Sequence, residues 1–144
     1  MEMEMENNNT TGYTELNVWK EARALVKHIY EFTAYYPESE RCGLALQTRD
    51  TAITVPSRIA EGAGRKQANA SLKYLLTAKS ALFELETLVY IAQDLSYCSE
   101  NDAQALINKI INSRKLLFGY IRFKEQKMNG KDEPNYNHHN TYNA

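Results

Sequence analysis

The chain has 144 residues, 43% of them hydrophobic and 24% charged, which favours one compact domain over a disordered chain. Its apolar runs are far shorter than the roughly 20 residues of a membrane-spanning helix, and six glycines and three prolines are too few for a turn-rich β fold. The net charge of −1 hides a mildly basic centre, because residues 13–127 hold 16 of the 17 Lys and Arg but only 13 of the 18 Asp and Glu, which leaves +3. Two cysteines, Cys42 and Cys98, are too few for a disulfide framework and indicate a reduced, cytoplasmic protein.

Both ends of the chain lack apolar periodicity. Residues 1–12 alternate Met and Glu before an Asn run, without the basic start and apolar centre of a secretion signal. We therefore expect disordered tails at residues 1–12 and 128–144 around a folded domain at residues 13–127. The adjacent His138 and His139 lack a third ligand in the same tail, so no metal site is expected.

Apolar residues at steps of four and three predict a first helix over residues 16–36, which Pro37 ends. They are Val18, Ala22, Leu25, Ile29, Phe32 and Tyr36.

A second helix is predicted over residues 40–62, with Ser39 as its N-cap and Gly62 and Gly64 as stop signals. Pro56 lies inside this segment and is expected either to bend the helix or to split it in two. The inward residues are mostly small, so this helix is expected to approach its neighbours closely; they are Ala45, Ala52, Val55 and Ile59.

The strongest pattern predicts a third helix over residues 67–96. Its seam consists of Leu75, Ala78, Leu82, Leu85, Val89 and Ala92. A fourth helix is predicted over residues 101–127, with Asn101 or Ser99 as its cap and Lys124 and Lys127 at the end where the helix dipole favours cations. Its apolar face consists of Ala103, Leu106, Ile110, Leu117 and Tyr120, flanked by Ile107 and Ile121. Four long amphipathic helices with short connections predict an all-α fold, an antiparallel up-and-down four-helix bundle.

The third predicted helix carries a second apolar column, formed by Leu76, Phe83 and Tyr90 at steps of seven. This column lies about 100° round the helix from the Leu75/Leu82/Val89 column. It either packs against a neighbouring helix of the same chain or forms a subunit interface, because exposed apolar ridges of this length are unusual on monomers.

The folded region offers little for catalysis or for a cofactor. It contains one histidine, His28, which as a lone helical residue indicates a structural role, and it has no Glu-x-x-His pair for a di-iron site. The segment from Gly62 to Lys66 (GAGRK) follows a helix rather than a strand and lacks the ending of a phosphate-binding loop. We therefore expect a protein that is not an enzyme and needs no cofactor.

The basic residues favour an anionic partner over the default of a solvated surface only if an oligomer repeats them. Lys20, Arg23 and Lys27 share one face of the first predicted helix, at spacings of three and four. Phosphate contacts accumulate roughly with their number, so a symmetric assembly turns modest patches into a nucleic-acid-binding surface. The candidate residues are Lys20, Arg23, Lys27, Arg49, Arg58, Arg65 and Lys66.

Several blocks of sequence carry a resemblance to a known family. They are residues 16–22 (LNVWKEA), Tyr36-Pro37 with Glu40 and Gly43-Leu44-x-x-Gln47, residues 55–62 (VPSRIAEG) with Gly64-Arg65, and Tyr74-Leu75 with residues 80–87 (SALFELET). Over residues 13–127 the chain resembles the four-helix-bundle proteins of the 23S rRNA intervening-sequence family. The residues that match the family's motif are Gln47, Pro56, Ile59, Ala60, Glu61, Gly62, Glu84 and Glu86.

The resemblance implies a bundle that assembles into a ring, typically a homopentamer. It also implies kinship with the pentameric accessory proteins of diversity-generating retroelements, which work with a reverse transcriptase and bind nucleic acid. The chain departs from the family in having Thr48-Arg49-Asp50 where many relatives have a pair of arginines, and Arg58 where they usually have Asn.

The expected function is that of a non-enzymatic, cytoplasmic homo-oligomer that binds RNA or a ribonucleoprotein through basic surface patches. Leu76, Phe83 and Tyr90 are the expected oligomer interface. The alternative is a structural scaffold or protein-binding adaptor, such as a reverse transcriptase accessory protein, that makes no direct contact with nucleic acid.

Overall fold

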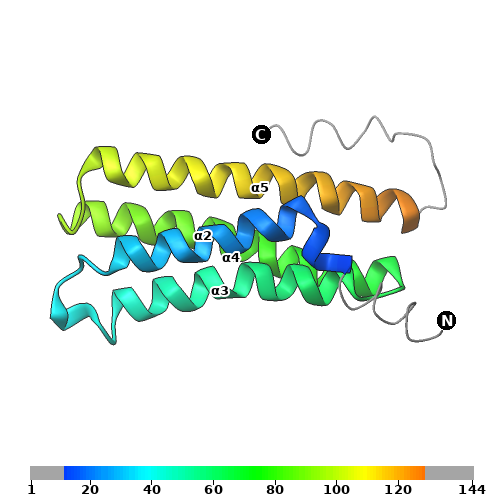
Figure 1. Cartoon of the computed structure of the whole chain (residues 1–144), viewed down its shortest axis with the longest axis horizontal. Coiled ribbons are helices and arrows are strands. Elements are labelled where there is room, and N and C mark those ends of the chain that lie inside the picture. Colours follow the sequence, from blue (N-terminus) through cyan, green and yellow to red (C-terminus); the bar gives the residue numbers. More distant parts are fainter. Residues whose placement is uncertain (1–11, 129–144) are drawn as a thin grey trace.

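The computed structural model describes residues 12–128, which form four long α-helices and two short 3-10 turns (Figure 1). In chain order these elements are η1 (Gly12–Glu15), α2 (Asn17–Thr33), η2 (Glu38–Glu40), α3 (Leu44–Ala63), α4 (Ala68–Asp94) and α5 (Glu100–Met128). No strand occurs within these described residues. Of the expected tails at residues 1–12 and 128–144, Gly12 is instead part of η1 and Met128 is the last residue of α5, and the remaining residues lie outside the described range.

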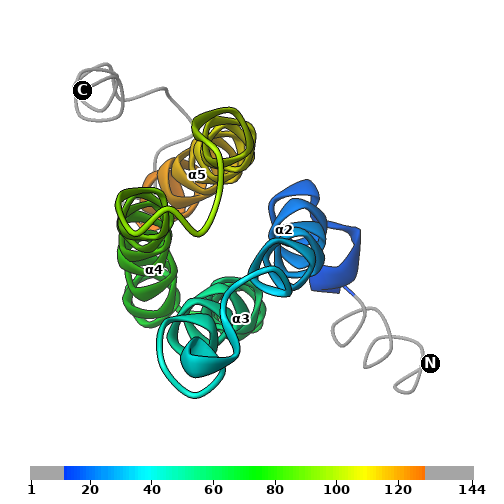
Figure 2. The ribbon, with the colours of Figure 1, turned by 90° about the vertical axis from the view of Figure 1, so that its left-hand side faces the viewer.

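The helices form the predicted antiparallel up-and-down bundle. Figure 1 shows α2 and α4 running in one direction and α3 and α5 in the other, and Figure 2 shows the four helices arranged around the bundle axis in chain order. The η1 turn, the α3–α4 connection and the end of α5 gather at one end of the bundle. None of the helices between residues 12 and 128 is long and apolar enough to cross a bilayer.

The predicted seam of α4 forms the middle of the core, and all six of its residues are fully buried. Five of them pack against the predicted apolar faces of α2, α3 and α5 in one continuous cluster, and Ala92 packs in a smaller cluster with Tyr36 and Ala45. Phe32 and Tyr120 are the exceptions, because they pack against the core while remaining partly exposed. The periodicity therefore located the core on all four helices.

Small residues let α3 and α4 approach closely, as predicted. The hydroxyl of Ser71 donates a 2.6 Å hydrogen bond to the carbonyl oxygen of Gly62, across the two helices. A Cβ atom at Gly62 would lie 2.9 Å from a methyl carbon of Leu75 and 3.1 Å from the carbonyl oxygen of Ser71. Gly62 is thus a packing residue inside α3, and Gly64 is the C-cap residue.

Two predictions about α3 are wrong. The helix begins at Leu44, because Glu38–Glu40 form a separate 3-10 turn, so Ser39 is not its cap. The capping acceptor is the carboxylate of Glu40, which accepts a 3.3 Å hydrogen bond from the Leu44 N–H. The same carboxylate accepts a 2.8 Å hydrogen bond from the hydroxyl of Tyr97, in the α4–α5 connection.

The other wrong prediction concerns the alternative in which α3 is split into two. The helix is continuous through Pro56, whose missing N–H donor is not enough to end it.

Of the two residues predicted as the cap of α5, Ser99 is the one that acts as the cap. Its hydroxyl accepts a 3.0 Å hydrogen bond from the Asp102 N–H.

A small second cluster closes the end of the bundle where α2 meets η2. Its centre is Tyr36, whose ring lies 5.9 Å from that of Phe32 and 5.5 Å from that of Tyr97, measured between ring centroids. The Tyr36 hydroxyl is buried and has no hydrogen-bond partner within the described part of the chain. Burial in particular, and then the nearby Cys98 and Glu40, raise the pKa of Tyr36 well above its usual 10.0.

We expect Tyr36→Phe to leave stability near neutral pH unchanged or slightly higher, because the hydroxyl it removes is buried without a partner. Above about pH 10 an unfolded tyrosine ionises while buried Tyr36 keeps its proton, so the native chain loses about 1.4 kcal/mol of stability per pH unit through this residue. Urea unfolding at a series of alkaline pH values should therefore show a shallower loss in Tyr36→Phe than in the natural chain. Identical slopes would contradict this assignment.

Candidate nucleic-acid interface

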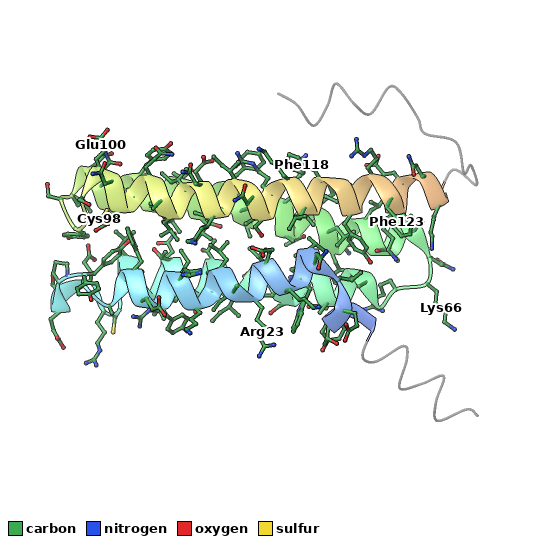
Figure 3. The ribbon with its side chains drawn as sticks, turned by 45° about the horizontal axis from the view of Figure 1, so that its top comes forward. Arg23, Lys66, Cys98, Glu100, Phe118 and Phe123 are labelled. Atoms are coloured by element: carbon green, nitrogen blue, oxygen red, sulfur yellow. The ribbon has the colours of Figure 1, made fainter. Side chains whose placement is uncertain are left out.

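Three basic side chains follow one face of α2, as predicted, and all three are exposed: Lys20, Arg23 and Lys27. Lys20 Nζ lies 3.8 Å from the Glu15 carboxylate, but both side chains are more than half exposed, so water weakens this ion pair. The Arg23 guanidinium lies 5.4 Å from the centre of the Trp19 ring, and Figure 3 shows Arg23 directed away from the bundle. Because a cation on an aromatic ring keeps its charge, this face presents positive charge to solvent.

The two predicted arginines of α3 have structural contacts. The Nε of Arg49 donates a 2.8 Å hydrogen bond to the hydroxyl of Thr33, and its guanidinium lies 4.6 Å from the centre of the Tyr30 ring, so Arg49 ties α3 to α2. Arg58 pairs with Glu61, one turn further on, at 2.6 Å between Nη1 and Oε1. The Glu61 carboxylate offsets the charge of Arg58, which leaves less of it for an external anion.

The last two predicted basic residues, Arg65 and Lys66, lie in the α3–α4 connection. There they line an open pocket of about 500 Å³ together with Lys124 and Lys127 from the last turns of α5. Figure 3 shows Lys66 at the same end of the bundle as Phe123, the neighbour of Lys124 in the chain. Burial, followed by the charge of Lys127, lowers the pKa of Lys124.

The seven predicted residues therefore do not form one patch. Arg49 and Arg65 are 16 positions apart along α3 and its end, which corresponds to about 24 Å of helix. The structure brings Arg65 and Lys66 together with two lysines for which the sequence indicated only a favourable place in the helix dipole. The one signal in the sequence that could have found this grouping is the predicted antiparallel order of the helices, which returns the end of α5 to the α3–α4 connection.

The second apolar column of α4 is only about half covered by the rest of the described chain. Leu76, Phe83 and Tyr90 are 47%, 44% and 47% exposed. About half of each side chain is therefore covered within the described chain, and the subunit interface stays a prediction for the exposed half. Arg114 covers part of the Phe83 ring, with its guanidinium 4.5 Å from the ring centre.

The matched motif residues of the second predicted helix serve mainly in packing. Ile59 is fully buried in the core and Gly62 lies against α4. Pro56 and Ala60 are half-buried, and Gln47 is exposed on α3.

The motif of the third predicted helix contributes an ion pair between helices. Glu86 of α4 accepts a 3.0 Å hydrogen bond from Arg114 of α5, and both side chains are largely buried. Glu84 is exposed on the same helix.

The other reactive side chains do not converge. His28 is half-exposed, with Nδ1 3.9 Å from the Glu31 carboxylate, and both Cys42 and Cys98 are free thiols. No group of three or more His, Cys, Asp or Glu that could hold a metal ion occurs between residues 12 and 128. His138 and His139 lie outside the described residues.

Comparison with known proteins agrees with this architecture. The profile of the 23S rRNA-intervening sequence protein family matches residues 14–119, which include α2, α3, α4 and most of α5. No curated protein matches the chain. Since the family profile covers well over half of the 144 residues, the chain belongs to the 23S rRNA-intervening sequence protein family.

Proposed function

We propose that this chain is a non-enzymatic, cytoplasmic homo-oligomer that binds RNA, or RNA within a ribonucleoprotein, through several basic patches. The observation that carries the proposal is that aromatic rings, and not carboxylates, contact several of the basic side chains. Arg23 rests on Trp19, Arg65 on Tyr74 and Lys127 on Phe123, at 4.6–5.4 Å from each ring centre. These rings orient the charges without neutralising them, which suits contacts with phosphates.

A homopentamer, as the sequence resemblance implies, would repeat each patch five times around a ring. The +3 charge of residues 13–127 would then rise to about +15 per assembly. Repetition matters because each phosphate contact adds a counterion-release contribution, so weak single patches yield strong binding to one long polyanion. The kinship with retroelement accessory proteins is part of this proposal, because those proteins bind nucleic acid.

The RNA function is tested by measuring the affinity for a structured RNA from about 50 to 200 mM salt, where phosphate-driven binding falls steeply. The natural chain should bind at the low end and lose affinity log-linearly as salt rises. Arg23→Gln/Lys27→Gln should weaken binding and flatten the salt slope by about 0.7–0.9 for each phosphate that a subunit no longer neutralises.

The control variant Arg58→Gln/Glu61→Gln removes an ion pair without changing the net charge, and should leave both affinity and slope unchanged. No binding at about 50 mM salt by the natural chain, where a phosphate contact is strong, would contradict the RNA function.

A second candidate function is a structural scaffold or protein-binding adaptor, for example for a reverse transcriptase. The half-exposed column of Leu76, Phe83 and Tyr90 favours it, since such a column suits a protein surface and not a phosphate chain. Oligomerisation without any RNA binding would support this candidate over the first.

A further inference from the structure

The pocket at the end of the bundle concentrates positive charge more than any structural role requires. Four of its seven lining residues are basic and none is acidic. The other three are small, so the backbone of the α3–α4 connection lines part of the surface; they are Ala63, Gly64 and Ala68. Its volume of about 500 Å³ falls within the roughly 300–1,000 Å³ of small-ligand sites.

Each of three cations in the pocket is held by an aromatic ring within ten positions of it in the chain. The Arg65 guanidinium lies 5.0 Å from the centre of the Tyr74 ring and donates a 3.1 Å hydrogen bond to its hydroxyl. Lys124 and Lys127 lie 5.6 Å and 4.6 Å from the ring centres of Tyr120 and Phe123. Within residues 12–128, none of these three cations, nor Lys66, forms an ion pair.

Helix dipoles do not account for this arrangement. The ends of α3 and α5 each place roughly half a negative charge here, while the start of α4 places about half a positive one. One lysine would offset the remaining half charge, yet four cations are present. Burial in particular, and then the charge of Lys127, lower the pKa of Lys124.

We propose that this pocket binds the terminal phosphate of an RNA strand. The proposal rests on the RNA function above and adds the chemical group that is recognised. A terminal phosphate monoester carries about −1.5 to −2 charges near neutral pH and offers three acceptor oxygens, whereas an internal phosphodiester carries one charge. Four clustered cations match the monoester better. At the start of α4, Gln67 makes no side-chain cap, and although the Ala70 N–H donates to the Asn69 side chain, the N–H of Ala68 itself lies at the pocket.

Part of the pocket lies outside the region that the family profile matches. The family profile ends at residue 119, and both Lys124 and Lys127 lie beyond it. Half of the cations therefore come from the part of α5 that the profile does not cover.

The experiment compares short single-stranded RNAs of one sequence that end in a 5′-phosphate, a 3′-phosphate or hydroxyls only, with the full chain at moderate salt. A phosphorylated end should bind about tenfold more tightly or better, since a charge-assisted hydrogen bond contributes enough for such a ratio. Lys124→Gln/Lys127→Gln should reduce this ratio to about one. Circular dichroism of the variant checks that it remains helical.

The matched control is Lys20→Gln/Lys27→Gln, which removes the same charge from α2, outside the pocket. It should weaken all three RNAs alike and keep the ratio. A nucleoside 5′-monophosphate and inorganic phosphate are each titrated into the complex with phosphorylated RNA as competitors. This distinguishes a pocket that recognises the end of a strand from one that binds any small phosphate. Competition by either one at the same concentration as the phosphorylated strand would overturn the strand-end assignment.

The outcomes separate the two proposals. Equal affinity for phosphorylated and hydroxyl ends would overturn the pocket assignment and leave the RNA function standing. The pocket assignment would also be overturned if the ratio of affinities for phosphorylated and hydroxyl ends fell as much in Lys20→Gln/Lys27→Gln as in Lys124→Gln/Lys127→Gln. No binding of any RNA would overturn both.

Discussion

Replacing Gly62 by valine should cost about 3 kcal/mol of the free energy of unfolding, as overpacking a close helix contact does. Even the first added carbon would lie 2.9 Å from a Leu75 methyl carbon and 3.1 Å from the backbone of Ser71. Leu75 is fully buried at the centre of the α4 seam, where close packing opposes any rotation away from the new side chain. The helices must separate, which also weakens the hydrogen bond from the Ser71 hydroxyl.

The same substitution at Gly119 is the control. Gly119 lies within α5, and a Cβ atom added there meets no atom within 4 Å. Glycine and valine differ by only a few tenths of a kcal/mol in helix propensity, so Gly119→Val should change stability by less than about 0.5 kcal/mol. Urea unfolding of both variants measures the difference. Equal losses at the two positions would show that the close contact at Gly62 does not matter for stability.

The contrast between these two glycines illustrates how far the sequence could predict this fold. The seam of α4 was predictable residue by residue, because strict steps of three and four fix which side chains face inward. The small residues of α3 predicted a close approach to a neighbour. They did not identify Gly62 as the contact, which depends on the register between α3 and α4, and Gly62 had the pattern of a stop signal.

The start of α3 was not predictable from local rules. Ser39 has the residue type of a cap, but the N–H of Leu44 is satisfied by Glu40, whose other carboxylate oxygen accepts from Tyr97. Tyr97 is 57 positions further along the chain. A local pattern cannot contain this contact, because it forms only once the α4–α5 connection has been brought beside η2.

The basic pocket could not be predicted from the sequence for the same reason. Its two halves come from the α3–α4 connection and the end of α5, and they meet because α4 and α5 have similar lengths, 27 and 29 residues. An α5 shorter by two turns would have ended before the pocket and left Arg65 and Lys66 as an isolated basic edge. The sequence likewise could not show which of the predicted basic residues lie on aromatic rings and which form ion pairs, because this depends on contacts between side chains.

If the chain forms the proposed homopentamer, Phe83→Glu should reduce its mass in solution to that of the 16.5 kDa monomer. Phe83 is 44% exposed at the centre of the column formed with Leu76 and Tyr90. Between subunits a carboxylate there would therefore lose its water, and Arg114, already bonded to Glu86, would offset only part of that cost. The monomer itself should tolerate the change. Arg114 lies over the Phe83 ring and offers the new carboxylate a partner of opposite charge.

The control is Thr77→Glu, which adds the same charge at an exposed position of α4, six residues away and about 120° round the helix from Phe83. Light scattering after size exclusion should give the pentamer mass for the natural chain and Thr77→Glu, and the monomer mass for Phe83→Glu. A monomeric natural chain at micromolar concentration would rule out the pentamer. If the pentamer forms and repeats the basic patches, Phe83→Glu should also weaken RNA binding by far more than its single charge explains, because each monomer then binds without the others.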